Sequence, residues 1–290
     1  MKKRRLFSLF ICAVLVFSLA SCARSKDGNV EYQLNTETDT YTLSYYTDTT
    51  TVTELVIPDE FDGKKITAIG ELAINNADSL QVMKIGKNIT SIDKWAVTNC
   101  RQLRDIQVAP ENEFYCSVDG VLFNKEKTEL LIYPNAKGAE YAKDGKLLKM
   151  GSYAVPDGVI TIGHAAFYKC YALESVTLPG SVVTIEDRAF QKANNLATVT
   201  IAEGLETIGV DAFHGCEALK ELTLPASLKK IDSYAFFNAF NLKKLTIGAP
   251  QAQLTLGKES GKDSWFPSTA GRDINAEITM AGIPYDRKAK

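Results

Sequence analysis

The chain has 290 residues, of which 45% are hydrophobic and 23% are charged, and its formal net charge is −2. This balance is typical of a globular protein, and the length is sufficient to bury a sizeable core in one or two domains. Lys and Arg residues are spread along the chain instead of forming a basic patch, so nucleic acid is not an expected partner.

Residues 1–21 have the organisation of an export signal. A basic stretch at residues 2–5 precedes an apolar run from Leu6 to Leu19. This run is too short to cross a bilayer comfortably, because a transmembrane helix needs about 20 apolar residues. The run ends in Leu-Ala-Ser-Cys, which resembles the lipobox of bacterial lipoproteins. The resemblance implies cleavage before Cys22 and lipidation of its thiol; a plain secretory signal with an incidental cysteine, or an uncleaved anchor, is the alternative.

The next two segments are expected to connect this signal to the folded domain. Residues 22–29 are predicted to be a lipidated tether, which even when fully stretched from Ala23 to Asn29 spans only about 25 Å. The folded part should therefore lie close to the bilayer surface. Residues 30–51 are rich in Tyr and Thr in an alternating pattern, which predicts a strand-rich N-terminal cap.

An Ala-Phe pair then recurs at intervals of 23 residues. The pairs begin at Ala166, Ala189, Ala212 and Ala235. When the Leu that opens a block, such as Leu173, is position 0, apolar residues recur at positions 3, 5, 9, 12, 16 and 17. Regular blocks open at Met150, Leu173, Leu196 and Leu219, and earlier copies open at Leu80 and Val52. Self-similarity at this period is typical of a solenoid, in which stacked coils bury a shared core.

The spacing within a block predicts the shape of one coil. Positions 3 and 5 alternate as in a short strand, so position 4 should face outward and the stacked strands should form a parallel sheet. The Pro at position 6 ends the strand because it lacks an amide donor. The Ala-Phe pair is expected to form a buried corner. The predicted fold class is therefore a β-rich solenoid over residues 52–248, with about 23 residues per coil.

The repeat also resembles a known family. The pattern LxxLTLPxSLxxIxxxAFxxC is similar to the BspA-like leucine-rich repeats of bacterial surface proteins, over about residues 30–248. The segment ENEFYCSVDGVLFNKEKTELLIYPN resembles the hairpin insertion that many members carry, and the insertion is expected at about residues 109–149. Beyond Gly248 the period fails, so residues 249–290 are predicted to be a C-terminal cap or tail with one final strand.

The cysteine and histidine residues do not indicate a reactive site. Cys100, Cys170 and Cys216 all occupy position 20, where other blocks have Ala, which predicts free, buried thiols. His164 and His214 lie in different coils without metal-ligand spacing, and surface positions are expected for both. The sequence contains no recognisable phosphate loop, nucleophile elbow or Cys-His pair. We therefore assign no catalytic residue, metal or cofactor, and we do not expect an enzyme.

The outward side of the predicted sheet is the candidate binding face. Its position-4 column consists of Thr177, Thr200, Thr223 and Thr246, and the neighbouring Lys220, Lys243 and Lys244 make its C-terminal part basic. Two interpretations remain open for these residues. Thr fits any exposed pleated surface and lysines are commonly solvated, but a regular solenoid face can also present side chains to a ligand.

The family resemblance implies a lipid-anchored, non-catalytic module for protein binding or adhesion at the cell surface. The alternatives are an accessory glycan-handling lipoprotein and a structural spacer. The expected partners are the membrane, through the N-terminal lipid, and an extracellular protein or other surface ligand. The expected location is the bacterial cell membrane or outer membrane, facing the surface or the periplasm.

Overall fold

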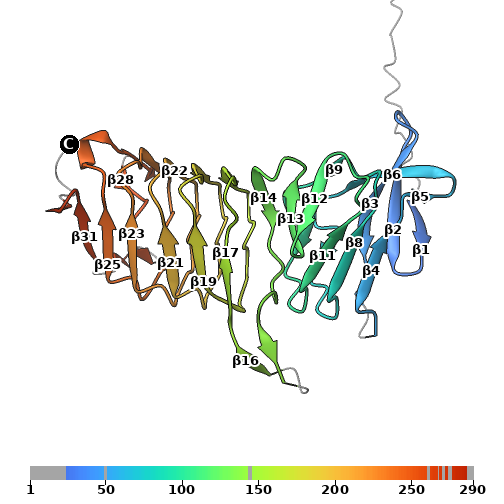
Figure 1. Cartoon of the computed structure of the whole chain (residues 1–290), viewed down its shortest axis with the longest axis horizontal. Helices are drawn as coiled ribbons and strands as arrows, with labels where there is room; N and C mark the ends of the chain where they lie inside the picture. The colour runs from blue at the N-terminus through green and yellow to red at the C-terminus, as the bar shows by residue number, and fades with distance from the viewer. Residues whose placement is uncertain are drawn as a thin grey trace, which may run out of the picture.

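The chain winds into an elongated β-solenoid of about nine turns with about 23 residues per coil, as the sequence predicts. The computed structural model describes residues 24–48, 51–142, 146–259, 262–266, 268–269, 272–273 and 276–285. Figure 1 shows the N-terminal strands at one end of the molecule and the C-terminal strands at the other. Among the described residues, η1 (Gln251–Gln253) is a single short 3-10 helix. The predicted signal peptide and Cys22 lie outside the described residues.

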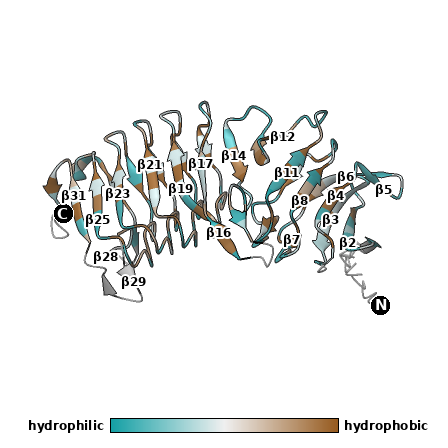
Figure 2. Cartoon of the chain, turned by 60° about the horizontal axis from the view of Figure 1, so that its bottom comes forward, coloured by the Kyte–Doolittle hydropathy of each residue, from teal (hydrophilic) through white to brown (hydrophobic). Residues whose placement is uncertain are grey.

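One strand of each coil lies on a side of the solenoid that we call the long-strand face. Its strands are β4 (Glu54–Ile57), β8 (Val82–Ile85), β11 (Asp105–Val108), β17 (Gly151–Ala154), β19 (Leu173–Leu178), β21 (Thr198–Ile201), β23 (Glu221–Leu224), β25 (Lys244–Ile247) and β31 (Glu277–Met280). The paired strands are parallel, and residues at the same repeat position lie beside one another, as with Val176 and Val199. Figure 2 shows these strands in a row along the molecule. The period of two therefore buries positions 3 and 5 and turns position 4 outward.

A second strand of most coils lies on the short-strand face. Its strands are β6 (Lys64–Ile69), β9 (Ser91–Ile92), β14 (Glu129–Ile132), β18 (Thr161–Ile162), β20 (Thr184–Ile185), β22 (Thr207–Ile208), β24 (Lys230–Ile231) and β26 (Thr255–Leu256). The strands from β14 to β26 form one continuous parallel ladder, and β6 pairs separately with β9. At a further corner, β7 (Ile74–Asn75) pairs with β10 (Val97–Thr98).

The Ala-Phe pairs form a buried corner, which confirms the prediction from the repeat. Phe167, Phe190, Phe213 and Phe236 are 0% exposed and stack in sequence, with ring centroids 4.7, 5.1 and 5.6 Å apart. The backbone turns beside each pair through left-handed residues at positions 15 and 19, such as Arg188 at φ 58° and Lys192 at φ 59°. Each corner of the regular coils therefore contains two left-handed residues.

The N-terminal cap is an antiparallel sheet that includes part of the expected tether. Its strands are β1 (Arg24–Asp27), β2 (Val30–Asn35) and β3 (Thr40–Tyr46), and β3 then pairs in parallel with β6, while β5 (Glu60–Phe61) pairs with β6 in the antiparallel sense. Residues 24–27 thus form a strand, because their backbone groups pair with those of residues 30–33, instead of a free linker.

Repeat geometry continues into the C-terminal segment. β31 pairs in parallel with β25 and is followed by the antiparallel β32 (Ile283–Pro284). Two short hairpins precede it, formed by β27 (Lys258–Glu259) with β28 (Lys262–Asp263), and by β29 (Ser268–Thr269) with β30 (Arg272–Asp273). The final strand expected near residues 274–284 therefore lies on the long-strand face.

The segment at about residues 109–149 contains two hairpins separated by a return to the solenoid. β12 (Tyr115–Val118) and β13 (Val121–Asn124) form the first hairpin, and β13 also pairs with β14. β14 then lies in register with β18, so the coil resumes at Glu129, ahead of Met150. The second hairpin, β15 (Glu140–Tyr141) with β16 (Leu147–Lys149), projects from the lower edge in Figure 1.

Strand β13 lies between two hydrophobic cores. The side chain of Leu122 packs into the N-terminal core, whereas those of Val121 and Phe123 pack into the C-terminal core. This division follows from the alternation of side chains along a strand. The first hairpin therefore joins the two halves of the solenoid through apolar contacts.

Candidate functional site

The outward side of the long-strand face brings the predicted threonines into one column. Thr177 lies beside Thr200, and Thr223 lies beside Thr246 in the ladder. The first three are exposed and Thr246 is half-buried. The column continues to Thr279, which pairs with Thr246 and was missed because the sequence around it lacks the repeat.

The predicted lysines lie on the same face, but their surroundings are not uniformly basic. Lys220, Lys243 and Lys244 are all exposed. The amide of Lys243 donates to the carbonyl of Lys220 at 2.8 Å, so these two residues occupy successive coils. Lys244 lies in register between Glu221 and Glu277. Charges of opposite sign therefore alternate from strand to strand at position 2. The predicted increase in positive charge toward the C-terminus is found only at position 1, which Lys220 and Lys243 occupy.

The N-terminal part of the long-strand face has a different outward column. Val56, Lys84 and Gln107 lie beside one another there. The ammonium of Lys84 contacts the carboxylate of Glu54 at 2.8 Å. A shallow groove of about 400 Å³ crosses the ends of these strands beside Pro58 and Pro110. The long-strand face therefore has two chemically distinct halves, separated by the first hairpin.

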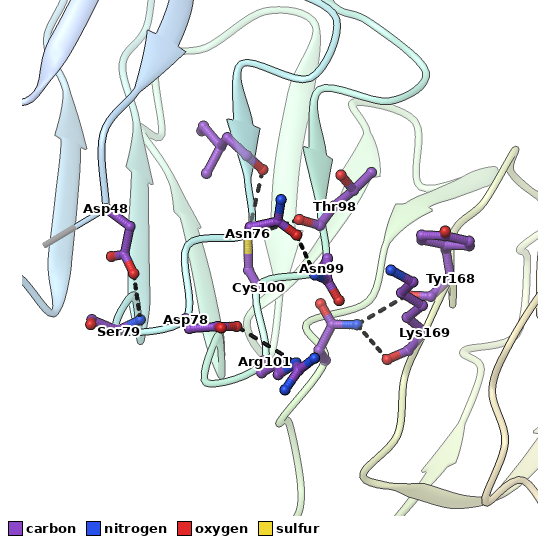
Figure 3. Close-up of polar contacts among 12 residues, drawn as sticks. Asp48, Asn76, Asp78, Ser79, Thr98, Asn99, Cys100, Arg101, Tyr168 and Lys169 are labelled. Atoms are coloured by element: carbon purple, nitrogen blue, oxygen red, sulfur yellow. Dashed lines mark hydrogen bonds and ion pairs between the residues drawn. The ribbon is translucent and has the colours of Figure 1, made fainter. Parts of the chain in front are cut away.

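The three thiols at position 20 are free and buried, as predicted. The thiol of Cys100 lies 3.5 Å from the carbonyl oxygen of Ile74, beside the hydrogen-bonded side chains of Asn76 and Asn99 (Figure 3). Burial raises the pKa of the Cys100 thiol to about 12 and raises the pKa values of Cys170 and Cys216 as well. At neutral pH these thiols are protonated and are poor nucleophiles.

The two histidines are partly buried corner residues, so the expected surface positions were wrong. His164 packs edge-to-face on Trp95, with ring centroids 5.0 Å apart. His214 Nδ1 lies 2.8 Å from Asp211 Oδ1. Among the residues that the structure describes, no group of three His, Cys, Asp or Glu side chains has the arrangement of a metal site.

Two hollows contain several carboxylates. The larger, of about 630 Å³, lies on the N-terminal cap and is lined by amide and hydroxyl side chains together with Glu37, Glu71 and Asp93. All three acids are exposed. The smaller, of about 80 Å³, lies where the short-strand face is interrupted and is lined by Glu129, Glu186 and Asp93, among others. Asp93 borders both hollows.

The lipidation prediction for Cys22 falls outside the described part of the chain. Within that part, no helix is both long enough and apolar enough to span a membrane. The strand β1 begins at Arg24, two residues after Cys22. A lipid on Cys22 would therefore lie next to the N-terminal cap.

A family model and several solved structures are similar to this chain. A family model described as the BspA type leucine rich repeat region matches residues 40–130 and 146–257, in six copies. Among solved structures, the pneumococcal vaccine antigen PcpA is similar in fold, with 17% identity, 90% of this chain and 88% of that chain covered, and a TM-score of 0.50.

Two further solved structures are more distant in shape. A leucine rich cell surface protein from Faecalibacterium prausnitzii is 18% identical, with 80% of this chain and 97% of that chain covered and a TM-score of 0.42. A leucine-rich repeat protein from Eubacterium ventriosum is 16% identical, with 91% and 96% covered and a TM-score of 0.45. No protein of curated function matches the sequence.

Proposed function

The chain belongs to the BspA-type leucine-rich repeat family, and from this premise we propose that it is a non-catalytic surface module that binds a protein ligand on the long-strand face. The observation that supports this most is the in-register outward column that runs through Thr223, Thr246 and Thr279. A solenoid fixes such side chains at regular intervals on an extended surface, which suits recognition of another macromolecule.

The residues on the long-strand face support binding and not catalysis. Lys244 lies beside Glu221 and Glu277, and the threonines of the column lie beside one another two residues further along the same strands. The thiols of Cys100, Cys170 and Cys216 are buried, and burial raises their pKa values, so they are protonated and poor nucleophiles at neutral pH. Binding without chemistry is the activity that this arrangement supports.

Attachment to a membrane through Cys22 is the second part of the proposal. The basic stretch, the apolar run and the Leu-Ala-Ser-Cys box support it. Acylation by two or more chains gives stable anchoring, since each buried methylene contributes about 0.8 kcal/mol. Because Arg24 already pairs with Gln33, the N-terminal cap would lie against the membrane and the solenoid would extend from it.

Glycan handling is the second candidate, and the large hollow on the N-terminal cap favours it. Gln33, Asn35 and Ser44 there provide hydrogen-bonding groups suited to sugar hydroxyls, and the volume of about 630 Å³ lies within the range of ligand pockets, about 300–1,000 Å³. A structural spacer is the third candidate, and it requires that neither surface bind anything.

The three candidates are separated by one capture experiment. The chain from Ala23 onward, which retains β1, is immobilised and exposed to extracellular matrix proteins, bacterial surface proteins and a glycan array. Capture of a protein that is reduced by substitutions on the long-strand face supports the proposal. Capture of a glycan that is reduced by Glu71→Gln supports the second candidate, and capture of nothing by any surface would leave only the spacer.

A further inference from the structure

The short-strand face is interrupted between β9 and β14. β9 pairs with β6 on one side, whereas β14 begins the next parallel ladder with β18 and pairs with β13 in the antiparallel sense. In Figure 1 the hairpin strands β12 and β13 lie between β9 and β14. The Tyr115 hydroxyl accepts a hydrogen bond from the amide of Ile92 at 3.1 Å. On its other side β9 therefore bonds to a tyrosine side chain instead of to a further strand.

A small cavity fills this interruption. Its volume is about 80 Å³, and its polar lining consists of Asp93, Lys94, Tyr115, Glu129, His164 and Glu186, with three aliphatic side chains completing the wall. Asp93 and Lys94 are exposed, whereas Glu129, His164 and Glu186 are half-buried. The cavity lining therefore combines solvated residues with residues that are partly covered by protein.

Glu129 is the first residue of a column that continues in threonines. In the ladder it lies beside Thr161, which lies beside Thr184, and Thr207 follows. A Cβ atom added at Gly163 would lie 3.1 Å from Glu129 Oε1 and 2.8 Å from the carbonyl oxygen of Leu130. The absence of a side chain at Gly163 therefore leaves room for the Glu129 carboxylate.

The carboxylates in the cavity are not neutralised by the protein. Neither Glu129 nor Glu186 forms an ion pair with any residue that the structure describes, and Lys94 is the single cation in the lining. Burial raises the pKa of Glu129, the nearby charge of Glu186 raises it further, and Lys94 opposes this increase. A carboxylate in this state is stabilised by an added positive charge.

His164 provides an acceptor in the same cavity. Burial lowers the pKa of His164, and Lys94 and Arg188 lower it further, so the imidazole is neutral at physiological pH. Its Nε2 atom is buried and has no hydrogen-bond partner among the described residues. A neutral imidazole has one ring nitrogen that accepts a hydrogen bond, and a buried polar atom without a partner is costly.

We propose that this cavity binds a single cationic group, a primary ammonium or a guanidinium, between the carboxylates of Glu129 and Glu186 and beside His164. Such a group supplies the positive charge that the carboxylates lack, and the neutral imidazole of His164 adds no competing charge. The volume admits one charged head with a short alkyl chain and is well below that of a drug-sized ligand pocket. A metal ion does not fit, since the described residues contain no three-ligand cluster.

Two sources could present this group, namely a small free amine and the basic side chain of a partner protein. A probe of each kind distinguishes them. The cavity lies on the short-strand face, so this inference does not depend on ligand binding at the long-strand face.

The experiment measures binding of matched probes to the full-length protein by isothermal titration calorimetry. The charged probes are n-propylammonium and blocked lysine, and their uncharged counterparts are n-propanol and blocked norleucine. The charged probes are expected to bind, and Glu129→Gln and Glu186→Gln should each weaken binding at least tenfold. Glu126→Gln, at the exposed turn between β13 and β14, is the matched control and should bind as the parent does.

Each outcome of this experiment decides the proposal. Binding of n-propylammonium but not of blocked lysine identifies a free amine as the source, and binding of both admits a protein side chain. Equal heats for charged and uncharged probes, or parental affinity in both folded Gln variants, would overturn the proposal. Because two separate glutamates are tested, a folding defect in one variant still leaves a decisive result from the other.

Discussion

The rings of Phe190 and Phe213 are stacked with centroids 5.1 Å apart and planes inclined by 4°. The two residues occupy the same position in successive coils, so their separation matches the distance between neighbouring strands, about 4.8 Å. At one end of the stack Tyr133 takes the place of a phenylalanine, with its centroid 4.9 Å from that of Phe167. The aromatic stack thus begins directly after β14, in the coil that precedes the regular blocks.

Truncation within this stack should destabilise the protein strongly. Phe213→Ala removes a fully buried ring, and comparable substitutions cost about 3–5 kcal/mol in the free energy of unfolding. Urea denaturation of the parent and variant measures the difference. Phe213→Leu, which retains most of the apolar volume, should cost less. A loss below about 1 kcal/mol in the Ala variant would show that the stack contributes little.

The thiols should differ in reactivity according to their burial. Cys100, Cys170 and Cys216 are buried, and their pKa values are raised by that burial, whereas Cys116 is half-exposed. At pH 8 an alkylating reagent should label Cys116 first and should label the other three only after unfolding. Peptide mass mapping identifies the labelled sites. A disulfide between any two of these cysteines would contradict the coil assignment.

Ionisation of Glu129 should cost stability near neutral pH. Its pKa is raised in the folded protein, so the folded state holds the proton to higher pH than the unfolded state does. The contribution of Glu129 to stability is therefore greatest below the ordinary carboxyl pKa and is lost as the pH rises through the folded value. Glu129→Gln should raise the melting temperature at pH 7.5 and should have little effect near pH 4. Glu126→Gln should show no such pH dependence.

This prediction also separates binding from folding at the cavity. Substitution of a residue whose only role is to stabilise the fold would lower the stability of the protein. Glu129→Gln is instead expected to give a more stable protein that no longer binds an ammonium probe, because functional sites often retain charges that the fold does not require.

The sequence predicted the features that repeat. Each coil uses the same apolar positions, so Phe190, Ile185 and Val176 could be assigned to the core from their spacing alone, and all three are buried. Position 20 was assigned correctly in the same way, because Cys exchanges there with Ala. Periodicity is a strong signal since it is repeated many times in one chain.

Features that occur once were harder to predict. Thr279 was missed because two short hairpins separate its strand from β25 and hide the period. Glu129 was missed because its importance depends on Gly163 and Glu186, which lie far away in the sequence. The left-handed conformation at Arg188 and Lys192 recurs in the other regular coils but was also missed, because neither residue type favours it. None of these three has a local sequence pattern.

Loss of the predicted lipid site should release the protein from the membrane. Cys22→Ala removes the thiol that would form the thioether, so metabolic labelling with a fatty acid should disappear and detergent partitioning should shift to the aqueous phase. Cys116→Ala, at a half-exposed cysteine of the first hairpin, is the matched control and should leave labelling unchanged. Unchanged partitioning of the Cys22→Ala protein would contradict lipid anchoring.

Charge substitution on the long-strand face should weaken ligand capture without unfolding the solenoid. The appropriate variant combines Lys220→Glu and Lys243→Glu with Lys244→Gln, because Lys244 lies in register between Glu221 and Glu277 and a third Glu there would add repulsion across the strands. All three lysines are exposed, and surface substitutions of this kind usually change stability by less than about 0.5 kcal/mol each.

Affinity for a protein captured by the parent is the quantity that tests the long-strand face. The triple variant should bind an acidic ligand at least tenfold more weakly at low salt, and this difference should shrink as salt screens the charges.

A control with the same change in net charge combines Lys26→Glu and Lys65→Glu with Lys127→Gln, at exposed positions away from this face. If both triple variants lose affinity equally, the effect reflects total charge alone. Parental affinity in the first variant at low salt would show that the ligand binds elsewhere, with the first hairpin as the next surface to test.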